Sequence, residues 1–495
     1  MNYKMMGNFI ARIVAVEAVF MLPAIFISLG CGETAAVKGF LMALAIMAAV
    51  AGVLFALCRK AGKLFGAREG MVCVGISWIV LSILGCLPFV FSGSIPRFID
   101  AFFETVSGFT TTGSSILSDV EALPKGMLYW RSFSHWLGGM GVLVFLLAIA
   151  PSEGGKGFTM HLLRAESPGP EVGKLVPKMK QTATILYLIY IAITVLDIGF
   201  LLMDRLPGID NGNPNDNMTL LDVFCTAFGT VGTGGFGVRN ASMGAFSPYL
   251  QNVTTVFMAL CGINFSCYYL ILLGSFKSVL KDEELRIYLG VFVAVVVLIV
   301  FDVRHLYGTL EETVRHSAFT VSTLITSTGY GTTDFDLWPA FSKGLLMMLM
   351  VVGACAGSTG GGFKWARAML IFKSLRRNIR QVLNPRKVEV VRVNGKVVSE
   401  SVLDNANAYL AAYIVIIILS YMVIAMDGFS VGTNLTAVLA TFNNMGPGLE
   451  AVGPTCNFSQ FSDLSKLVLS FDMLAGRLEI FPILVLLTRS TWTRK

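Results

Sequence analysis

Four short glycine-centred stretches recur along this chain, and each lies between two apolar segments. They are Thr110-Thr111-Thr112-Gly113, Val231-Gly232-Thr233-Gly234, Thr326-Ser327-Thr328-Gly329 and Asn443-Asn444-Met445-Gly446. A phenylalanine precedes the glycine by ten residues in three of them, at Phe103, Phe224 and Phe319, and the fourth has Thr436 there. Because four copies of a helix–loop–helix unit can close around one axis, this repeat constrains the fold more than any other feature.

Composition places the repeat in a membrane. Of 495 residues, 55% are hydrophobic and 14% are charged, whereas soluble domains have about 25% charged residues. We expect an all-α membrane protein without a cleavable signal peptide, since Arg12 and Glu17 interrupt the first apolar stretch and no small-residue cleavage site follows. Segments with the roughly 20 apolar residues that cross a bilayer are 9–31, 39–58, 71–93, 127–150, 182–203, 248–275, 286–303, 341–368, 405–426 and 464–488.

A shorter apolar segment lies between spans three and four, five and six, seven and eight, and nine and ten. These four segments are at about 98–112, 219–233, 313–328 and 433–445. Each is too short to cross and ends in a glycine stretch, which is typical of a re-entrant half-helix whose loop faces a water-filled cavity. The predicted repeat is therefore span–pore helix–loop–span. It is present four times around a pseudo-fourfold pore, after two extra N-terminal transmembrane helices.

This pattern divides the chain into six parts: two extra helices in 1–68, pore repeat 1 in 69–153, a linker with pore repeat 2 in 154–276, pore repeat 3 in 277–370, a cytoplasmic linker in 371–404 and pore repeat 4 in 405–495. In that last linker, Asn394-Gly395 lies between β-branched runs within 388–398. Asn-Gly in this setting predicts a β-hairpin, which we treat as a hypothetical docking element for a cytoplasmic partner.

Charge gives the orientation. Basic residues cluster at 59–68, 174–180, 277–286, 364–396 and 489–495, and ten spans place every cluster on one side, which the positive-inside rule identifies as the cytoplasm. Both termini are then cytoplasmic, and the net charge of +7 is a topology signal rather than a nucleic-acid site. Acidic residues on the other side, among them Asp100, Glu104, Asp119 and Glu450, either concentrate cations at the mouth or are ordinary solvated loop residues.

The four loops have the composition of a cation filter. Removing the water shell of a cation is costly, and inward-facing backbone carbonyls replace that shell. Glycine permits the unusual backbone angles this requires, and each half-helix aims the negative end of its dipole at the cavity. The alternative is that the glycines only allow close helix packing. The predicted filter residues are Thr111, Thr112, Gly113, Gly232, Thr233, Gly234, Ser327, Thr328, Gly329, Asn444, Met445 and Gly446.

A glycine-rich run in the eighth span predicts a gate. So many small residues do not form a firm helix, and a broken segment below the filter would open and close the pore; the alternative is a tight helix crossing. Arg477 lies in the last span, where an arginine is costly and usually functional. It either contacts carbonyls of the broken segment or pairs with Glu479 or Asp472. The role of Asp197 in span five stays open. The predicted gate residues are Gly353, Gly357, Ser358, Thr359, Gly360, Gly361, Gly362 and Arg477.

Enzyme chemistry is not expected. Ser134 and His135 open span four, but no activating acid or nucleophile motif accompanies them. We assign them a helix-end anchoring role, with Trp130 and Trp136 at the membrane interface. The nine cysteines and four histidines show no metal-ligand spacing, so no cofactor is expected in this chain.

In the stretches 104–114, 136–141, 355–362 and 444–479, the sequence resembles the Trk/Ktr/HKT superfamily of potassium transporters, and most closely the TrkH/TrkG type of potassium-uptake membrane subunit. The resemblance covers essentially the whole chain, and the extra N-terminal spans are similar to the Trk branch. It implies a K+ filter on the pseudo-fourfold axis, an intramembrane gate at 353–362 and a pore arginine at Arg477.

The resemblance also implies a homodimer in the bacterial inner membrane, with one pore per chain. A cytoplasmic, TrkA-like regulatory subunit would carry the nucleotide, NAD or ATP/ADP. In related plant transporters a serine for the first filter glycine goes with sodium transport, so glycine at Gly113, Gly234, Gly329 and Gly446 favours potassium. The expected function is potassium uptake through a selective, gated, channel-like pore; the alternative is potassium symport coupled to H+ or Na+.

Overall fold

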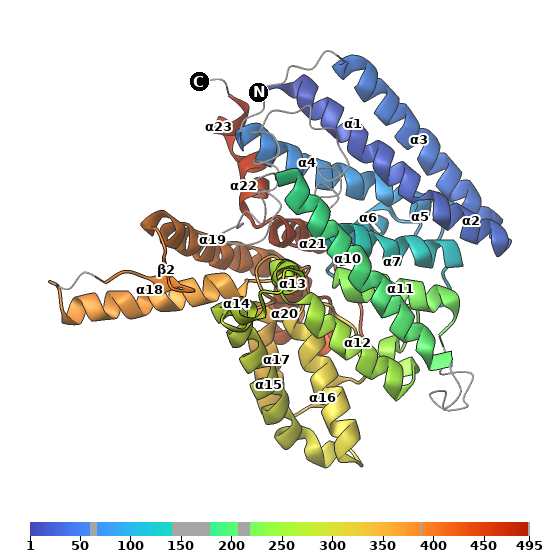
Figure 1. Cartoon of the computed structure of the whole chain (residues 1–495). Coiled ribbons are helices and arrows are strands. Elements are labelled where there is room, and N and C mark those ends of the chain that lie inside the picture. Colours follow the sequence, from blue (N-terminus) through green and yellow to red (C-terminus); the bar gives the residue numbers. More distant parts are fainter. Residues whose placement is uncertain (60–66, 141–178, 206–217, 387–388, 494–495) are drawn as a thin grey trace.

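The computed structural model describes residues 1–59, 67–140, 179–205, 218–386 and 389–493 (Figure 1). The N-terminal part and first repeat contain α1 (Tyr3–Phe20), α2 (Leu22–Gly30), α3 (Thr34–Cys58), α4 (Ala67–Gly85), α5 (Leu87–Ser92), α6 (Phe98–Phe109) and α7 (Lys125–Gly139). The second repeat contains α10 (Met179–Leu202), α11 (Leu220–Gly232), α12 (Pro248–Cys261) and α13 (Phe265–Leu272), followed by α14 (Phe276–Leu280).

The third repeat contains α15 (Glu283–Val303), α16 (Leu310–Ile325), α17 (Ala340–Val351) and α18 (Trp365–Leu383). After the strands β1 (Arg392–Val393) and β2 (Lys396–Val397), the last repeat contains α19 (Glu400–Ile424), α20 (Val431–Phe442), α21 (Asp463–Arg477), α22 (Phe481–Leu487) and α23 (Arg489–Trp492). Short 3-10 turns are η1 (Met203–Arg205), η2 (Ser242–Ala245), η3 (Arg304–Leu306), η4 (Phe335–Leu337), η5 (Ala425–Asp427) and η6 (Glu450–Val452).

Six continuous stretches of the described chain are long and apolar enough to cross a membrane: 3–30, 34–58, 68–92, 181–202, 283–306 and 400–427. They are the two extra N-terminal spans and the first span of each repeat, as the sequence predicts. A proline at the start of the next helix accompanies the break between α1 and α2, and again that between α4 and α5, because proline lacks the N–H that would continue the helix.

The second spans of repeats two to four are interrupted helices, and the sequence predicts only one of these breaks. The predicted span 248–275 bends by 90° between α12 and α13. Span 341–368 is non-helical from 352 to 364, which confirms the predicted break there. Span 464–488 is interrupted between α21 and α22, where Glu479 and Ile480 have φ of 59° and 64°. The rest of span 127–150 after Met140 lies outside the described residues.

The four pore helices pack in a closed cycle. Each contacts the first and second spans of its own repeat and the second span of the preceding one. Thus α6 packs on α4, α7 and α21; α11 on α10, α12 and α7; α16 on α15, α17 and α12; and α20 on α19, α21 and α17. This rotation of partners gives the pseudo-fourfold arrangement that the sequence predicts.

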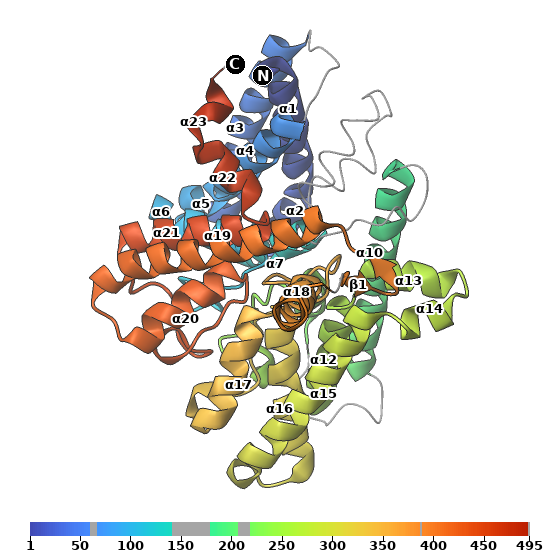
Figure 2. The same ribbon diagram turned by 90° about the vertical axis from the view of Figure 1, so that its left-hand side faces the viewer.

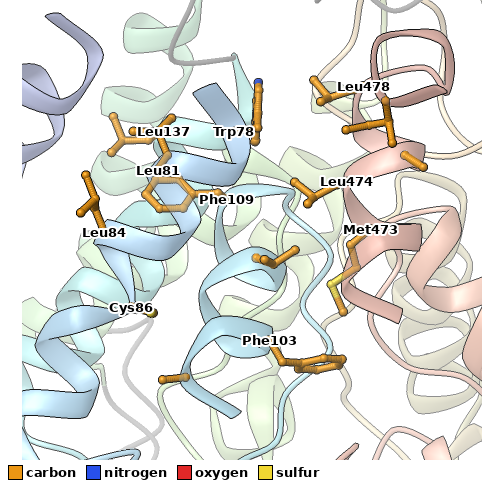
Figure 3. Packing of buried hydrophobic residues seen from close by; sticks show 14 of the residues in the cluster. Trp78, Leu81, Leu84, Cys86, Phe103, Phe109, Leu137, Met473, Leu474 and Leu478 are labelled. Atoms are coloured by element: carbon orange, nitrogen blue, oxygen red, sulfur yellow. The ribbon is translucent and has the colours of Figure 1, made fainter. Parts of the chain in front are cut away.

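Apolar side chains of the first pore helix pack in a hydrophobic core (Figure 3). Phe103 and Phe109 of α6 are fully buried and lie between α4, which supplies Trp78, and α21, which supplies Met473. Close packing of this kind fixes side chains in single conformations. The core therefore holds the end of α6, and with it the first glycine loop, in one position.

Both ends of the described chain lie on the same side (Figures 1 and 2). The amino group of Met1 is 4.0 Å from the carboxylate of Glu69, and the Arg68 guanidinium donates to the carbonyl oxygen of Thr493 at 3.3 Å. The predicted hairpin is present as β1 and β2, which pair antiparallel. Asn394 and Gly395 form its turn with φ of 50° and 77°, the two positive values that a type I′ turn requires.

Candidate filter and gate

The four glycine loops share one backbone conformation. Just after each pore helix stands a residue that is left-handed, with φ of 52° to 55°, although it is not glycine. These residues are Thr111, Thr233, Ser327 and Asn444. Two positions later comes a glycine with φ between 76° and 94°: Gly113, Gly235, Gly329 and Gly446. Left-handed non-glycine residues are uncommon and cluster at functional sites, so four at equivalent positions are a repeated, built feature.

Hydrogen bonds in the loops repeat as well. The residue between the two left-handed positions donates its N–H to the carbonyl five residues earlier, over 2.8 to 2.9 Å. The four bonds are Thr112 to Ser107, Gly234 to Gly229, Thr328 to Thr323 and Met445 to Ala440. This bond closes the C-terminal end of each pore helix in the same way, as a 6→1 bond does in a Schellman motif.

The second loop is shifted by one residue from the sequence prediction. Its left-handed glycine is Gly235, not Gly234, and Gly234 takes the position of Thr112 and Thr328. The predicted phenylalanine marker fails for the same reason: Phe224 is exposed, and the buried residue ten before Gly235 is Cys225. Consecutive glycines allow two registers in the sequence, and only the backbone conformation distinguishes them.

Each loop lies against the next around a ring. A Cβ placed on Gly113 would overlap the carbonyl oxygen of Gly234, and one on Gly235 would overlap that of Thr328. A Cβ on Gly329 would lie 2.7 Å from the carbonyl oxygen of Met445, and one on Gly446 would lie 2.9 Å from that of Thr112. Every contact is closer than a real Cβ tolerates, so these glycines are required by space as well as by φ. The four loops that carry the twelve predicted filter residues thus lie against one another, and Gly235 joins the set.

Hydroxyls brace the first and third loops from within. The Oγ1 atoms of Thr110 and Thr112 are 2.8 Å apart, and those of Thr326 and Thr328 are 2.7 Å apart. In the fourth loop, Asn444 Nδ2 donates to Thr112 Oγ1 at 3.0 Å and to the carbonyl of Met473 at 2.9 Å. Ser114 Oγ donates to the carbonyl of Gly446 at 2.9 Å. These bonds join loops one and four directly.

Behind the second loop lies His135, and its predicted interfacial role is wrong. The side chain is fully buried; Nδ1 is 2.8 Å from the carbonyl oxygen of Gly108, and Nε2 accepts the N–H of Phe236 at 3.2 Å. Trp130 is also fully buried and donates to the carbonyl of Gly85. Ser134 Oγ donates to the Arg131 carbonyl at 2.6 Å. The aromatic residues and small residues of α7 therefore face the protein interior.

A buried ion pair supports the mouth of the first two loops, and the sequence analysis missed its role. Arg131 Nε donates to Glu104 Oε1 at 2.6 Å, and Nη1 donates to the Gly237 carbonyl at 2.9 Å. Glu104 also accepts the N–H of Ile116 and the hydroxyl of Ser115, both at 2.9 Å. Glu104 is thus not a free acid of the mouth. The signal was present in the sequence as an acid within a predicted pore helix and an arginine within the following span.

The predicted gate residues form an irregular segment directly below loops three and four. Gly353 N–H donates to the Phe363 carbonyl at 3.1 Å, and Cys355 N–H to the Gly262 carbonyl at 3.0 Å. The N–H of Gly361 donates to Ser327 Oγ. A Cβ on Gly360 would lie 2.8 Å from the carbonyl of Thr326, and one on Gly361 2.6 Å from that of Asn443. Because the segment is not helical, the alternative of a tight helix crossing is wrong. Its other members are Gly357, Ser358, Thr359 and Gly362.

Arg477 joins this segment to the first repeat. Nη1 donates to the Thr359 carbonyl at 2.9 Å, and Nη2 donates to the Gly138 and Gly139 carbonyls at 2.5 and 2.7 Å. Of the two carboxylates proposed as alternative partners, Glu479 pairs with Arg367 and Asp472 accepts from Ser420 at 2.7 Å. The carbonyl-binding role predicted for Arg477 is confirmed.

On the hairpin side, the same segment is held by Glu284. Its Oε1 accepts the N–H of Ala356 at 2.6 Å and that of Ala366 at 3.1 Å. The preceding residue, Glu283, exchanges two backbone–side-chain hydrogen bonds with Asn394, at 2.9 and 3.0 Å, and Asn394 Nδ2 donates to Asp282 at 2.8 Å. The hairpin turn is therefore linked to the gate segment through two consecutive residues, Glu283 and Glu284. The sequence does not reveal this link.

The part of the chain that the structure describes has no set of side chains that could hold a resident metal ion. No three His, Cys, Asp or Glu side chains gather there, and all nine cysteines are free. Any cation at the loops would be held by backbone and hydroxyl oxygens, which suit hard, weakly bound ions.

The fold and these loops define a multi-pass membrane protein of the pore-loop class. Residues 36–491 match the family model TrkH, cation transport protein. The chain is 34% identical over 464 residues to the Trk system potassium uptake protein TrkH of Escherichia coli K12, covering 92% of each. It is 31% identical over 477 residues to TrkG of the same strain, covering 95% of each.

A crystal structure of the potassium transporter TrkH from Vibrio parahaemolyticus superimposes with a TM-score of 0.87 at 29% identity, over 100% of both chains. The chain belongs to the TrkH family of cation transport proteins. This membership and the superposition confirm the predicted fold class, and place the protein among transporters rather than enzymes.

Proposed function

We propose that this chain takes up potassium ions through a selective, gated, channel-like pore driven by the membrane potential. The observation that carries the proposal is the fourfold repetition of one loop conformation, with each filter glycine lying against a carbonyl of the next loop. The relatives, potassium uptake proteins of the Trk system, point to the same ion.

Selectivity follows from the packing of the ring. Carbonyl oxygens replace the hydration shell of the ion, and the loops cannot easily contract around a smaller cation because each filter glycine already touches its neighbour. The C-terminal ends of the four pore helices add negative potential at the same place. K+ is the transported ion and is not a resident cofactor.

Gating is assigned to the segment 353–362 and Arg477. The segment lies directly beneath loops three and four, and the Arg477 guanidinium fixes it to the end of α7. A positive charge in a low-dielectric passage opposes cations, so conduction requires this segment and Arg477 to move aside.

The chain is proposed to work as a homodimer in the bacterial inner membrane, with both termini cytoplasmic and the lipid bilayer around its apolar spans. The basic clusters support this orientation. A cytoplasmic, TrkA-like subunit would bind NAD or ATP/ADP and act on the gate. The hairpin at Asn394 is the proposed contact, because it is hydrogen-bonded to the helix that holds the gate segment.

Potassium symport with H+ or Na+ is the second candidate. Three membrane-buried carboxyls favour it: Glu17, Asp197 and Asp472 each have at least one oxygen without a hydrogen-bond partner among the described residues. Such groups are costly in a membrane and can carry protons.

The test is uptake of radioactive rubidium by proteoliposomes that contain the purified chain, with potassium or sodium as competitor. A channel-like pore gives uptake that stops at electrochemical equilibrium and is blocked by potassium but not by sodium. Accumulation of rubidium beyond that equilibrium, driven by an imposed proton or sodium gradient, would establish symport instead. No cation flux from folded protein, even after deletion of 357–362, would contradict the pore itself.

A further inference from the structure

We infer that His135 is the positioning residue of the second filter loop, and that its imidazole sets how well the pore distinguishes potassium from sodium. The inference rests on the proposed filter function. It concerns a side chain that packs against Gly234 of the second loop, the loop that has two glycines where loops one and three have threonines.

The second loop lacks the threonine–threonine brace of the first and third loops. Its Thr233 hydroxyl donates to the carbonyl of the preceding residue, Gly232, at 2.7 Å. At the positions where loops one and three carry a pair of hydrogen-bonded threonines, it has Gly232 and Gly234. Loop four has Asn443 in the first of these positions, which donates to the carbonyl of Leu439 at 3.0 Å and to the hydroxyl of Tyr413 at 2.9 Å. Two glycines provide no side chain and add backbone freedom, so loop two needs support from outside.

The ring of His135 occupies the missing side-chain volume. A Cβ placed on Gly234 would overlap the Cγ, Nδ1 and Cδ2 positions of that ring, and one on Gly232 would lie 2.6 Å from the His135 carbonyl oxygen. Gly234 is not among the glycines with positive φ, so its backbone conformation does not require glycine. The residue is glycine because the imidazole fills the space.

The two ring nitrogens have fixed and different roles. Nε2 lies 3.2 Å from the backbone nitrogen of Phe236 and can only accept there, so Nδ1 carries the proton and donates to the Gly108 carbonyl at 2.8 Å. This is one neutral tautomer with both nitrogens satisfied. The imidazole thereby joins the last turn of the first pore helix to the exit of the second loop.

The bond to Phe236 orients a filter carbonyl. Phe236 N–H and the Gly235 carbonyl belong to one peptide unit, which is planar and trans, so that the two groups point in opposite directions. Because the N–H points toward the imidazole, the Gly235 carbonyl points away from it. His135 thus fixes the plane of the peptide that follows the left-handed glycine of loop two.

Within the same chain, repeat four provides the comparison. Gly138 of α7 and Gly476 of α21 are equivalent, since a Cβ on either would overlap the carbonyl of the last residue of its own pore helix, Phe109 or Phe442. Three residues before Gly476 stands Met473, in the place of His135. The helix α21 packs on the first pore helix as α7 packs on the second. The first loop has its own threonine brace, and there an apolar side chain suffices.

The test compares His135→Leu, which removes both hydrogen bonds at similar volume, with His135→Gln, whose amide can both donate and accept. Met473→Leu is the matched control at the equivalent position. The readout is the ratio of sodium to potassium inhibition constants for rubidium uptake into proteoliposomes. We expect the ratio to fall about five- to tenfold in His135→Leu, the factor that one or two net hydrogen bonds provide, and to stay near the parent value in His135→Gln and Met473→Leu.

An unchanged ratio in folded His135→Leu, or a ratio equally reduced in His135→Gln and Met473→Leu, would overturn the inference. If His135→Leu does not fold, the result rests on His135→Gln. A ratio of sodium to potassium inhibition constants near that of the parent supports the positioning role, and a strongly reduced ratio contradicts it. Absence of potassium-inhibited uptake in the parent would instead contradict the proposed function, which keeps the two failures distinct.

A second pair of variants tests the shared volume. Gly234→Ala places a methyl group in the ring and should abolish uptake, whereas His135→Ala combined with Gly234→Ala removes the overlap. We expect the double variant to recover uptake, with the selectivity of His135→Leu. Uptake by the single Gly234→Ala variant at the parent level would show that the imidazole does not occupy this space.

Discussion

Arg477 Nη1 donates to the carbonyl oxygen of Thr359 at 2.9 Å, and so joins the last span to the irregular segment of the third repeat. The other terminal nitrogen bonds the end of α7. One side chain therefore fixes the closed arrangement of three elements that come from different repeats, and its charge lies in the route proposed for the ion.

Arg477→Ala should raise rubidium uptake several-fold. It removes the three hydrogen bonds and a unit charge that repels cations in a passage of low dielectric constant. Arg477→Lys keeps the charge without the fork geometry, and should give an intermediate rate. The measurement is the initial rate in proteoliposomes with equal amounts of protein. A lower rate in Arg477→Ala than in the parent would show that the arginine promotes conduction.

Gly113→Ser should reduce the preference for potassium over sodium, and Gly235→Ser should do the same in the second loop. Both glycines have positive φ and face a carbonyl of the next loop, so a side chain costs about 1–2 kcal/mol in backbone strain and displaces the neighbouring oxygen. The control is Gly199→Ser on α10, where a Cβ meets nothing within 4 Å. Competition assays with both ions give the result; an unaltered preference in Gly235→Ser would contradict the corrected register.

The four-repeat architecture and three of the four loop registers could be predicted from the sequence, because apolar length and glycine position report directly on what a bilayer permits. The second register could not. Gly234 and Gly235 are the same residue type, and the choice depends on which one adopts a left-handed conformation against Thr328, a contact between distant segments. The breaks after Cys261 and Arg477 were also missed, since each lies within a mostly apolar segment long enough to be read as one span.

The supports of the filter were missed for a related reason. His135 and Arg131 occur near aromatic residues at a span end, a pattern typical of a membrane interface, yet both side chains are buried. Their partners, the Gly108 carbonyl and Glu104, come from another helix. Polar contacts between helices depend on how the helices rotate about their axes, which apolar periodicity alone does not define for α7.

Glu104→Gln should destabilise the protein by about 3–5 kcal/mol, because it leaves the buried Arg131 without its charged partner. The control is Asp463→Asn, which removes the exposed partner of Arg97 at 2.5 Å, an interaction worth at most about 1 kcal/mol. The midpoint of thermal unfolding in detergent measures both variants. Equal midpoints for the two variants would indicate that the buried pair contributes no more than a surface pair.

The contribution of Glu450 to the stability of the fold should decrease as the pH falls. Its carboxylate accepts hydrogen bonds from the Ser430 hydroxyl and from the hydroxyl and N–H of Thr433, at the start of the fourth pore helix, and these bonds lower its pKa. The stabilisation is then complete above the ordinary glutamate pKa and is lost as the pH falls through the lowered one. The difference in unfolding midpoint between the parent and Glu450→Gln should be constant near neutral pH and shrink in acid. A difference that grows in acid would contradict the assignment.

Glu284→Gln should loosen the gate segment. The neutral amide is a weaker acceptor for the Ala356 and Ala366 N–H groups than the carboxylate, since hydrogen bonds to charged groups are worth about 1.5–3 kcal/mol against about 1 kcal/mol for neutral ones. Hydrogen exchange of peptides covering 353–366 should therefore accelerate by about tenfold, with peptides from the fourth pore helix as the internal control. Uniform acceleration across the protein would indicate global destabilisation instead of local release.

Asn394→Ala should produce the same local change in a weaker form. The asparagine side chain accepts the N–H of Glu283 and donates to Asp282, and the substitution removes both bonds. Because Glu284 follows these two residues directly, loosening the hairpin turn should reach the gate segment through the start of α15. Asn378→Ala, on the exposed surface of α18, is the control. Faster exchange of 353–366 with an altered response of uptake to the cytoplasmic partner would establish the hairpin as the input to the gate. If deletion of 388–398 leaves the response of uptake to the cytoplasmic partner unchanged, the hairpin is excluded as the docking element, because regulation that survives without the hairpin does not pass through it.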